Sequence, residues 1–241
     1  MISTQIPLNI QLPDSASFDN FILGKNEELF NKLKRSINNR SSEGSLLFWG
    51  GPGVGKTHLL QAACKSAGDH EFSSAYLSFK DLLKKPTNEL DNLENLDLIC
   101  LDDVDLVAGK KDWEQALFHL YNRAFDSGAQ LVFASSQAIA NLNLILSDLS
   151  SRLAWGFVYR IQPLSDEEKI QAMQLRSRLR GFILTEKVGQ YLLRHCPRDS
   201  VALFNLLDEL DRASLAAQRA ITIPFVKNLL ASKEKQAEEA L

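Results

Sequence analysis

The sequence predicts an α/β protein, in which a parallel β-sheet covered by helices on both faces is followed by a small all-helical domain. Short apolar runs alternate with segments of helical periodicity from about residue 46 to residue 161, and such continuous runs are typical of strands buried on both faces. After Pro163 only helical patterns follow, so we place the domain boundary there.

The elements of the first domain are assigned in chain order. We expect buried strands in the runs SLLFWG, LDLICLDDV and QLVFASSQ, a short strand in SAYLSF, and a fifth strand in GFVYRI. The segments HLLQAACKSAG and DWEQALFHLYNRAFDSG have the spacing of amphipathic helices, and each ends in a glycine. This alternation predicts parallel strands joined by helical crossovers.

The second domain begins with SDEEKIQAMQLRSRLRG, in which Ser165 and Glu168 predict a capping box and Gly181 ends the helix. The segments TEKVGQYLLRH, DSVALFNLLDELDRASLAAQ and TIPFVKNLL predict three further helices. We therefore expect an α/β domain over residues 12–163 and a helical domain over residues 164–232. A peptide of residues 1–11 precedes them, and a charged tail of residues 233–241 follows.

The composition narrows the classes of function. The chain of 241 residues has a net charge of −3, which gives no general attraction to nucleic acid or to an anionic membrane. No run of about 18 apolar residues is present, and the first residues lack the features of a signal peptide. The three cysteines are isolated and have no metal-binding spacing, so we expect reduced thiols in a cytoplasmic protein.

The stretch GGPGVGKT matches the phosphate-binding pattern G-x-x-x-x-G-K-[ST] at every fixed position, between a predicted strand and a predicted helix. Backbone N–H groups in such a loop surround phosphate oxygens, and the helix N-terminus adds a favourable dipole. The cofactor is expected to be ADP or ATP: Lys56 would contact its β-phosphate and, in ATP, its γ-phosphate, and the Thr57 hydroxyl would bind Mg²⁺. The other residues expected at this cofactor site are Gly51, Gly53, Val54, Gly55 and His58. The alternative is an ordinary glycine-rich turn between a strand and a helix.

The run LICLDDV supplies a second part of this site, because it ends an apolar strand with two aspartates. Ligands of open α/β sheets bind at the carboxyl ends of the strands, where Asp102 and Asp103 are expected. Asp102 is predicted to hold Mg²⁺ through water, and Asp103 to polarise the attacking water. The alternative is an acidic strand end whose carboxylates cap a helix.

Five segments together resemble the AAA+ module of the DnaA family of bacterial initiators: FDNFILGKNEEL, LLFWGGPGVGKTHLLQA, LICLDDVD, LFHLYNRAFDSG and LSSRLAWG. The resemblance extends from about residue 12 to residue 230 and includes the order and spacing of the segments. It implies a five-stranded parallel sheet of strand order 5-1-4-3-2, followed by a helical lid.

The resemblance also implies roles for residues outside the phosphate loop. Ile22 and Leu23 match the segment that packs on the adenine ring. Ser136 matches a polar sensor near the γ-phosphate, and Arg198 matches a lid arginine that contacts the phosphates. Hydrophobic packing, a strand-end cap and a surface arginine are the respective alternatives.

Arg152 in LSSRLAWG matches the arginine finger of AAA+ proteins, which acts on the nucleotide of a neighbouring molecule. The charge of a finger neutralises the γ-phosphate in the transition state, and in other systems it raises the rate on the order of 10³- to 10⁵-fold. The alternative is a surface arginine paired with Asp148, four residues earlier on the same helical face. AAA+ modules also associate face to tail, so a homo-oligomer is a further expectation.

The stretch QIPLNI resembles the short peptide by which bacterial proteins bind the DNA polymerase sliding clamp, with Gln5, Leu8 and Ile10 as its contact residues. A strand packed on the domain is the alternative. No DNA-reading domain follows the predicted lid within these 241 residues, so we expect DNA contact only through the clamp. The resemblance then implies a regulator that stimulates hydrolysis of ATP bound to DnaA and so prevents reinitiation. A loader or adaptor ATPase that uses its own hydrolysis on nucleic acid is the competing hypothesis.

Overall fold

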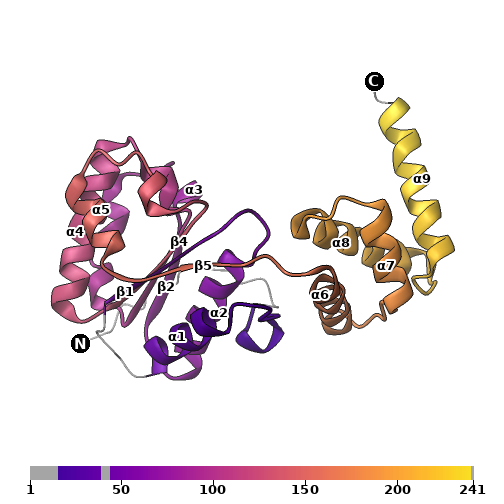
Figure 1. The fold of residues 1–241 in the computed structure, drawn as a ribbon, viewed down its shortest axis with the longest axis horizontal. Coiled ribbons are helices and arrows are strands. Elements are labelled where there is room, and N and C mark those ends of the chain that lie inside the picture. Colours follow the sequence, from indigo (N-terminus) through magenta and orange to yellow (C-terminus); the bar gives the residue numbers. More distant parts are fainter. Residues whose placement is uncertain (1–15, 39–43, 240–241) are drawn as a thin grey trace. The chain divides into compact units, whose positions relative to one another are not determined.

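The computed structural model describes residues 16–38 and 44–239. The predicted clamp-binding residues Gln5, Leu8 and Ile10 lie outside this described part. The chain divides into two compact units, of which the first ends at Gln162 and the second begins at Pro163. Figure 1 shows a sheet with helices in the first unit and helices alone in the second.

The first unit contains a sheet of five parallel strands. Its strand order is β2-β3-β4-β1-β5, which confirms the order 5-1-4-3-2 that the sequence resemblance implied. The strands are β1 (Ser45–Trp49), β2 (Ser74–Ser78), β3 (Leu98–Asp102), β4 (Gln130–Ser135) and β5 (Gly156–Arg160). Strands β1, β3 and β4 are central and almost fully buried, as their continuous apolar runs require.

Helices cover both faces of the sheet (Figure 1). The first face carries α1 (Glu27–Asn38) and α2 (Lys56–Asp69), and the second carries α3 (Phe79–Leu82), α4 (Lys111–Ser127) and α5 (Ser147–Ala154). Alternate side chains of a strand point to opposite faces, so Leu46 and Phe48 belong to the first hydrophobic cluster whereas Leu47 belongs to the second. These two clusters hold the nucleotide-site elements in place from both sides.

The second unit has its own hydrophobic core, built by α6 (Asp166–Leu179), α7 (Glu186–His195), α8 (Ser200–Ala217) and α9 (Ile223–Glu239). The predicted capping box is present at the start of α6, where Ser165 and Glu168 bond each other's backbone N–H groups. Helix α9 continues through residues 233–239 of the predicted tail. No helix in the described part of the chain is long and apolar enough to cross a membrane.

The pairing of β1 with β5 fixes two opposite edges of the sheet. Ser45 lies opposite Gly156 at the amino ends of these strands, and Trp49 lies opposite Arg160 at their carboxyl ends. The GGPGVGKT loop follows Trp49, whereas α5 ends at Ala154, just before β5 begins. Four residue steps of about 3.3 Å separate the two edges by about 13 Å along the strands.

Candidate functional site

The phosphate loop joins β1 to α2 and contains two glycines in the left-handed region, Gly53 with φ of 74° and Gly55 with φ of 98°. The Lys56 ammonium donates hydrogen bonds to the carbonyl oxygens of Gly50 at 2.7 Å and Gly51 at 2.9 Å. Burial lowers the pKa of Lys56 below its usual value, and the negative charge of Asp102 opposes this effect. The lysine therefore lies across the loop, where phosphate oxygens would replace its carbonyl acceptors.

Asp102 is the centre of a small polar cluster beside this loop. Its carboxylate oxygen Oδ2 accepts hydrogen bonds from the Thr57 hydroxyl at 2.6 Å and the Tyr76 hydroxyl at 3.0 Å. Its other oxygen, Oδ1, accepts from the backbone N–H of Asp103 at 2.9 Å. Burial raises the pKa of Asp102, and the bonds from Thr57 and Tyr76 reduce the shift. The same burial, together with the charge of Asp102, raises the pKa of Tyr76.

The donor set at this place fits Mg²⁺, because a hydroxyl and a carboxylate are the hard oxygen donors that this ion prefers. Thr57 and Asp102 bring these two oxygens together at the end of the phosphate loop. The described residues contain no group of three or more histidine, cysteine, aspartate or glutamate ligands. This is consistent with an ion that takes its other ligands from phosphate and water.

Asp103 directly follows Asp102 and Ser136 directly follows β4, and the side chains of both are hydrogen-bonded. Asp103 has a φ of 56°, and its Oδ2 oxygen accepts from the Lys80 ammonium and the Ser78 hydroxyl, each at 3.1 Å. The hydrogen bond to Asp103 is the largest cause of a raised pKa at Lys80. Ser136 donates from its hydroxyl and its backbone N–H to the Asp105 carboxylate, at 2.6 and 2.8 Å. Their roles toward water and phosphate stay predictions.

The segment before α1 lies against the other side of the loop. Phe21 and Leu23 are partly buried against the same hydrophobic cluster as Val54 of the phosphate loop. The His58 ring lies 5.6 Å from the Phe21 ring, and its Nε2 atom is 3.0 Å from the carbonyl oxygen of Ser17. The structure thus brings the predicted adenine-binding segment next to the phosphate loop.

Arg152 lies at the amino edge of the sheet, away from this site. Its guanidinium carbon is 5.8 Å from the ring centroids of both Tyr121 and Trp155. The Tyr121 hydroxyl lies 3.2 Å from the Ser45 hydroxyl, at the first residue of β1. Within the described part of the chain the structure contains no ion pair between Arg152 and Asp148, the partner in the alternative interpretation.

Comparisons with known proteins give the family. The family model of the bacterial DnaA ATPase domain matches residues 12–160, which is more than half of the chain. The chain belongs to the DnaA family. A second family model, that of the Hda lid domain, matches residues 166–230. Together these matches describe a DnaA-related AAA+ replication protein with an Hda-type lid.

Solved structures support the same assignment. The chain is 27% identical to AMPPCP-bound DnaA from Aquifex aeolicus, with a TM-score of 0.69, over 82% of this chain and 66% of that chain. Domain III of the Thermotoga maritima initiator DnaA is 22% identical, with a TM-score of 0.81, over 91% of this chain and 97% of that chain, a likeness that shows the fold. The RuvB branch migration motor of Thermotoga maritima, at 16% identity and a TM-score of 0.67, covers 90% of this chain and 72% of that chain and shares the fold alone.

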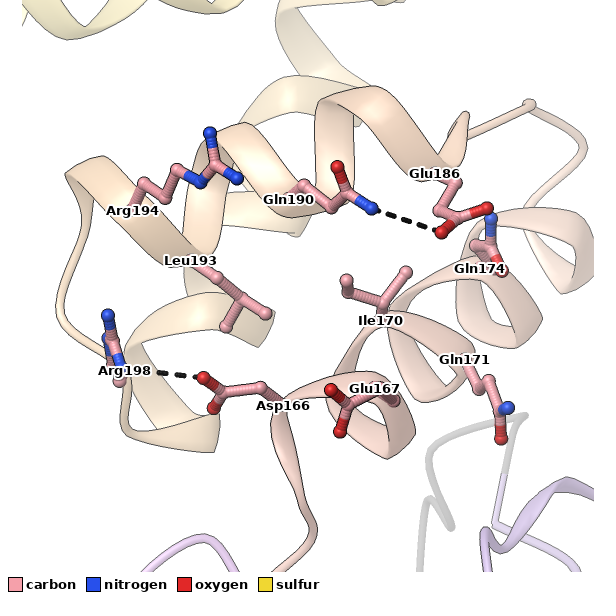
Figure 2. A pocket seen from close by; sticks show the side chains of 10 residues that line it. All are labelled: Asp166, Glu167, Ile170, Gln171, Gln174, Glu186, Gln190, Leu193, Arg194 and Arg198. Carbon is pink, nitrogen blue, oxygen red and sulfur yellow. Dashed lines mark hydrogen bonds and ion pairs between the residues drawn. The ribbon is translucent and has the colours of Figure 1, made fainter.

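The lid of this DnaA-family chain contains Arg198, which borders a hollow of about 550 Å³ between α6 and α7 (Figure 2). Its guanidinium is 3.4 Å from a carboxylate oxygen of Asp166, and its side chain is 66% exposed. An exposed pair of this kind is weak, so the arginine can exchange Asp166 for a phosphate at little cost. Its role as a lid arginine stays a prediction.

Two residues of the DnaA-family site were not predicted from the sequence. Tyr76 donates to Asp102, and Asp105 holds both polar groups of Ser136. Tyr76 lies opposite Cys100 in the pairing of β2 with β3, two residues before the position opposite Asp102. Only the register of these strands would have indicated this contact, because residues two apart on neighbouring strands share a face.

Proposed function

We propose that this chain regulates the initiation of DNA replication by stimulating hydrolysis of the ATP that is bound to DnaA, which inactivates the initiator and prevents reinitiation. The family assignment and the Hda-type lid support a DnaA-related regulator. The observation on which the proposal rests is the place of Arg152, at the edge of the sheet opposite the chain's own phosphate loop.

That position supports a role of Arg152 toward the nucleotide of another molecule. Arg152 lies beside Tyr121, which contacts the first residue of β1, whereas the phosphate loop follows the last residue of β1. The length of the strand separates the two edges by about 13 Å. A γ-phosphate that Arg152 neutralises therefore belongs to a second molecule, and the chain acts as an arginine-finger donor.

The chain's own site holds ADP or ATP with Mg²⁺ in this proposal. Lys56, Thr57 and Asp102 are arranged for phosphate and metal, and DnaA of Aquifex aeolicus, a relative, is described as AMPPCP-bound. Arg198 keeps in this proposal the role that the sequence resemblance implies, as an arginine that contacts the phosphates. The bound nucleotide is mainly structural, and turnover by the chain itself is slow.

In this proposal the N-terminal peptide places the chain at sliding clamps on DNA. We assign Gln5, Leu8 and Ile10 to binding of the sliding clamp, so that the chain reaches DNA through the clamp. Tethering raises the effective concentration of Arg152 near DnaA on the same DNA without any new contact. A pull-down with loaded clamp tests this assignment, and alanine at Gln5 and Leu8 is expected to abolish retention.

A second candidate is an ATPase that works on nucleic acid through its own hydrolysis. The presence of Lys56, Thr57, Asp102 and Asp103 together favours it, because these are residue types that phosphate binding, Mg²⁺ binding and activation of water require. A relative that is 25% identical is described as DnaA bound to AMPPCP and single-stranded DNA, with a TM-score of 0.73, over 95% of this chain and 71% of that chain.

Single-turnover hydrolysis of labelled ATP prebound to DnaA separates the two candidates. Clamp-dependent acceleration that is lost with Arg152→Ala supports the regulator. Arg35→Ala removes another arginine, from the exposed side of α1, and is expected to accelerate hydrolysis as the wild type does. Normal acceleration by Arg152→Ala would refute the finger, and DNA-stimulated turnover by this chain alone would favour the second candidate.

A further inference from the structure

A buried carboxylate lies beneath the helix that carries Arg152. Glu114, in the first turn of α4, is 0% exposed. Its Oε1 oxygen accepts hydrogen bonds from the backbone N–H groups of Gly109 at 2.8 Å and Ile145 at 3.1 Å. Its Oε2 oxygen accepts from the backbone N–H of Leu146 at 2.8 Å. Three N–H donors on one carboxylate satisfy a charge that would otherwise be strongly unfavourable in the interior.

The donors Ile145 and Leu146 directly precede α5, and Leu146 is its N-cap residue. Helix α5 has eight residues and receives no side-chain hydrogen bond at its N-cap. Isolated helices of this length are not stable in water, so α5 depends on its surroundings for position. Leu149 and Leu153 fix which face of α5 is buried, and Glu114 fixes where the helix begins.

The third donor, Gly109, belongs to the segment that follows the nucleotide-site residue Asp103. Gly109 follows η4 (Val104–Val107), a single turn of 3₁₀-helix that begins directly after Asp103. Glu114 therefore connects the segment that follows β3, through Gly109, to the segment that precedes α5, the helix that contains Arg152. Breaking these bonds would release the start of α5 and leave its two buried leucines in contact with the core.

We propose that Glu114 is a positioning residue for Arg152: its carboxylate holds the segment before α5 so that the guanidinium is presented in one place. The inference rests on the proposed function, because it concerns the reaction that Arg152 promotes. Glu114 does not contact the nucleotide of the partner. It acts through the backbone of Ile145 and Leu146, and so on the geometry of the finger.

The test compares Glu114→Gln with wild type in the hydrolysis of ATP prebound to DnaA, at increasing concentrations of this chain with loaded clamp. The glutamine amide has the same size as the carboxylate, but its nitrogen cannot accept a hydrogen bond from a backbone N–H, so at least one of the three hydrogen bonds is lost. We expect the maximal rate to fall roughly 10- to 100-fold, because small misplacements of a catalytic group have effects of this order. The half-saturating concentration is expected to stay within about twofold, since the surface of the chain is unchanged.

Two further readouts separate positioning from general loss of stability. Amide hydrogen exchange is expected to rise in α5 and to stay unchanged in α1 and α2. Leu33→Ala serves as the stability control, because it opens a cavity in the core on the opposite face of the sheet. It should lower the melting temperature at least as much as Glu114→Gln and leave the maximal rate unchanged.

The results that overturn the inference are a wild-type rate or unchanged α5 exchange in Glu114→Gln, or an equal loss of rate in Leu33→Ala. If Glu114→Gln fails to fold, Glu114→Asp takes its place: the charge remains, but the shorter side chain cannot reach both loops. Failure of the proposed function is recognised separately. In that case wild type gives no acceleration, or Arg152→Ala accelerates normally, whatever the Glu114 variants do.

Discussion

Gly55 is the residue of the phosphate loop for which the structure makes the sharpest prediction. Its φ is 98°, a conformation that residues with a Cβ atom rarely adopt. A Cβ atom at this position would lie 2.7 Å from Cε2 of Phe21, whose ring stacks on Phe30 and lies beside His58. Gly55→Ala therefore changes both the backbone of the loop and the packing of the predicted adenine-binding segment.

The two effects can be added. A left-handed alanine costs about 1–2 kcal/mol, and moving an aromatic ring off its preferred rotamer costs about 0.5–1.5 kcal/mol. The lower conformational entropy of the unfolded alanine chain offsets about 0.4–1 kcal/mol of this. The free energy of unfolding should thus fall by about 2 kcal/mol, which corresponds to about 4–8 °C in melting temperature for a protein of this size.

Gly68→Ala is the matched control, since Gly68 lies in α2, the helix for which Gly55 is the N-cap residue, and a Cβ atom there meets nothing within 4 Å. This variant is expected to gain about 0.5–1 kcal/mol, because alanine is the better helix former. Thermal unfolding followed by circular dichroism measures both, and binding of a fluorescent nucleotide reports on the loop. If Gly55→Ala melts at or above the wild-type temperature, the steric reasoning about Phe21 is wrong.

Three further predictions follow from the sheet and its two edges. Asp102→Asn should stabilise the nucleotide-free protein at neutral pH in the presence of a chelator. Burial raises the pKa of Asp102 in the native state, so the native state binds the carboxyl proton more tightly than the unfolded state does. The protein therefore loses stability as the pH rises from the ordinary carboxyl pKa through the raised one. The gain in melting temperature from the asparagine should vanish at acid pH, where the wild-type carboxyl group is protonated. Gly156→Ala should destabilise the protein more than Gly55→Ala. The φ of Gly156 is 137°, and a Cβ atom there would collide with the carbonyl oxygen of Ser45, which cannot move without breaking the β1–β5 pairing. A fall in melting temperature equal to or smaller than that of Gly55→Ala would contradict this. Arg152→Ala should leave the chain's own ATP hydrolysis unchanged in dilute solution, and a reduced single-turnover rate there would mean that the arginine acts on its own nucleotide.

The fold was predictable because its local and global signals agree. The strands β1, β3 and β4 are continuous apolar runs, and the glycine loop that follows β1 places that strand at the phosphate site. The capping box at Ser165 marks the start of the lid in the sequence as it does in the structure. The strand order, in contrast, came from the resemblance to the DnaA family, because alternation of strands and helices leaves several orders open.

The contacts around the site were not predictable in the same way. Tyr76 reaches Asp102 from β2, and Asp105 reaches Ser136 from η4. Strand β3 is buried on both faces, so its sequence carries no alternation that would fix its register against β2. Glu114 is a sharper case, because a glutamate in the first turn of a helix predicts an exposed residue that favours the helix dipole. Its complete burial depends on the loop before α5, which lies 31 residues further along the chain at Ile145.

Under the proposed function, the separation of the two edges would let one chain hold a nucleotide and act on the nucleotide of another molecule. The loop with Lys56 and the helix with Arg152 are attached to opposite ends of the same strand pair, β1 and β5. A rigid, fully paired strand pair keeps these ends apart, so the arginine cannot fold back onto its own phosphates. In the proposed complex, a partner docked at the amino edge would meet an arginine that lies beside Tyr121, on a helix whose N-cap residue is hydrogen-bonded to Glu114. Under the proposed function, a chain built in this way would need no hydrolysis of its own to promote hydrolysis in a neighbour.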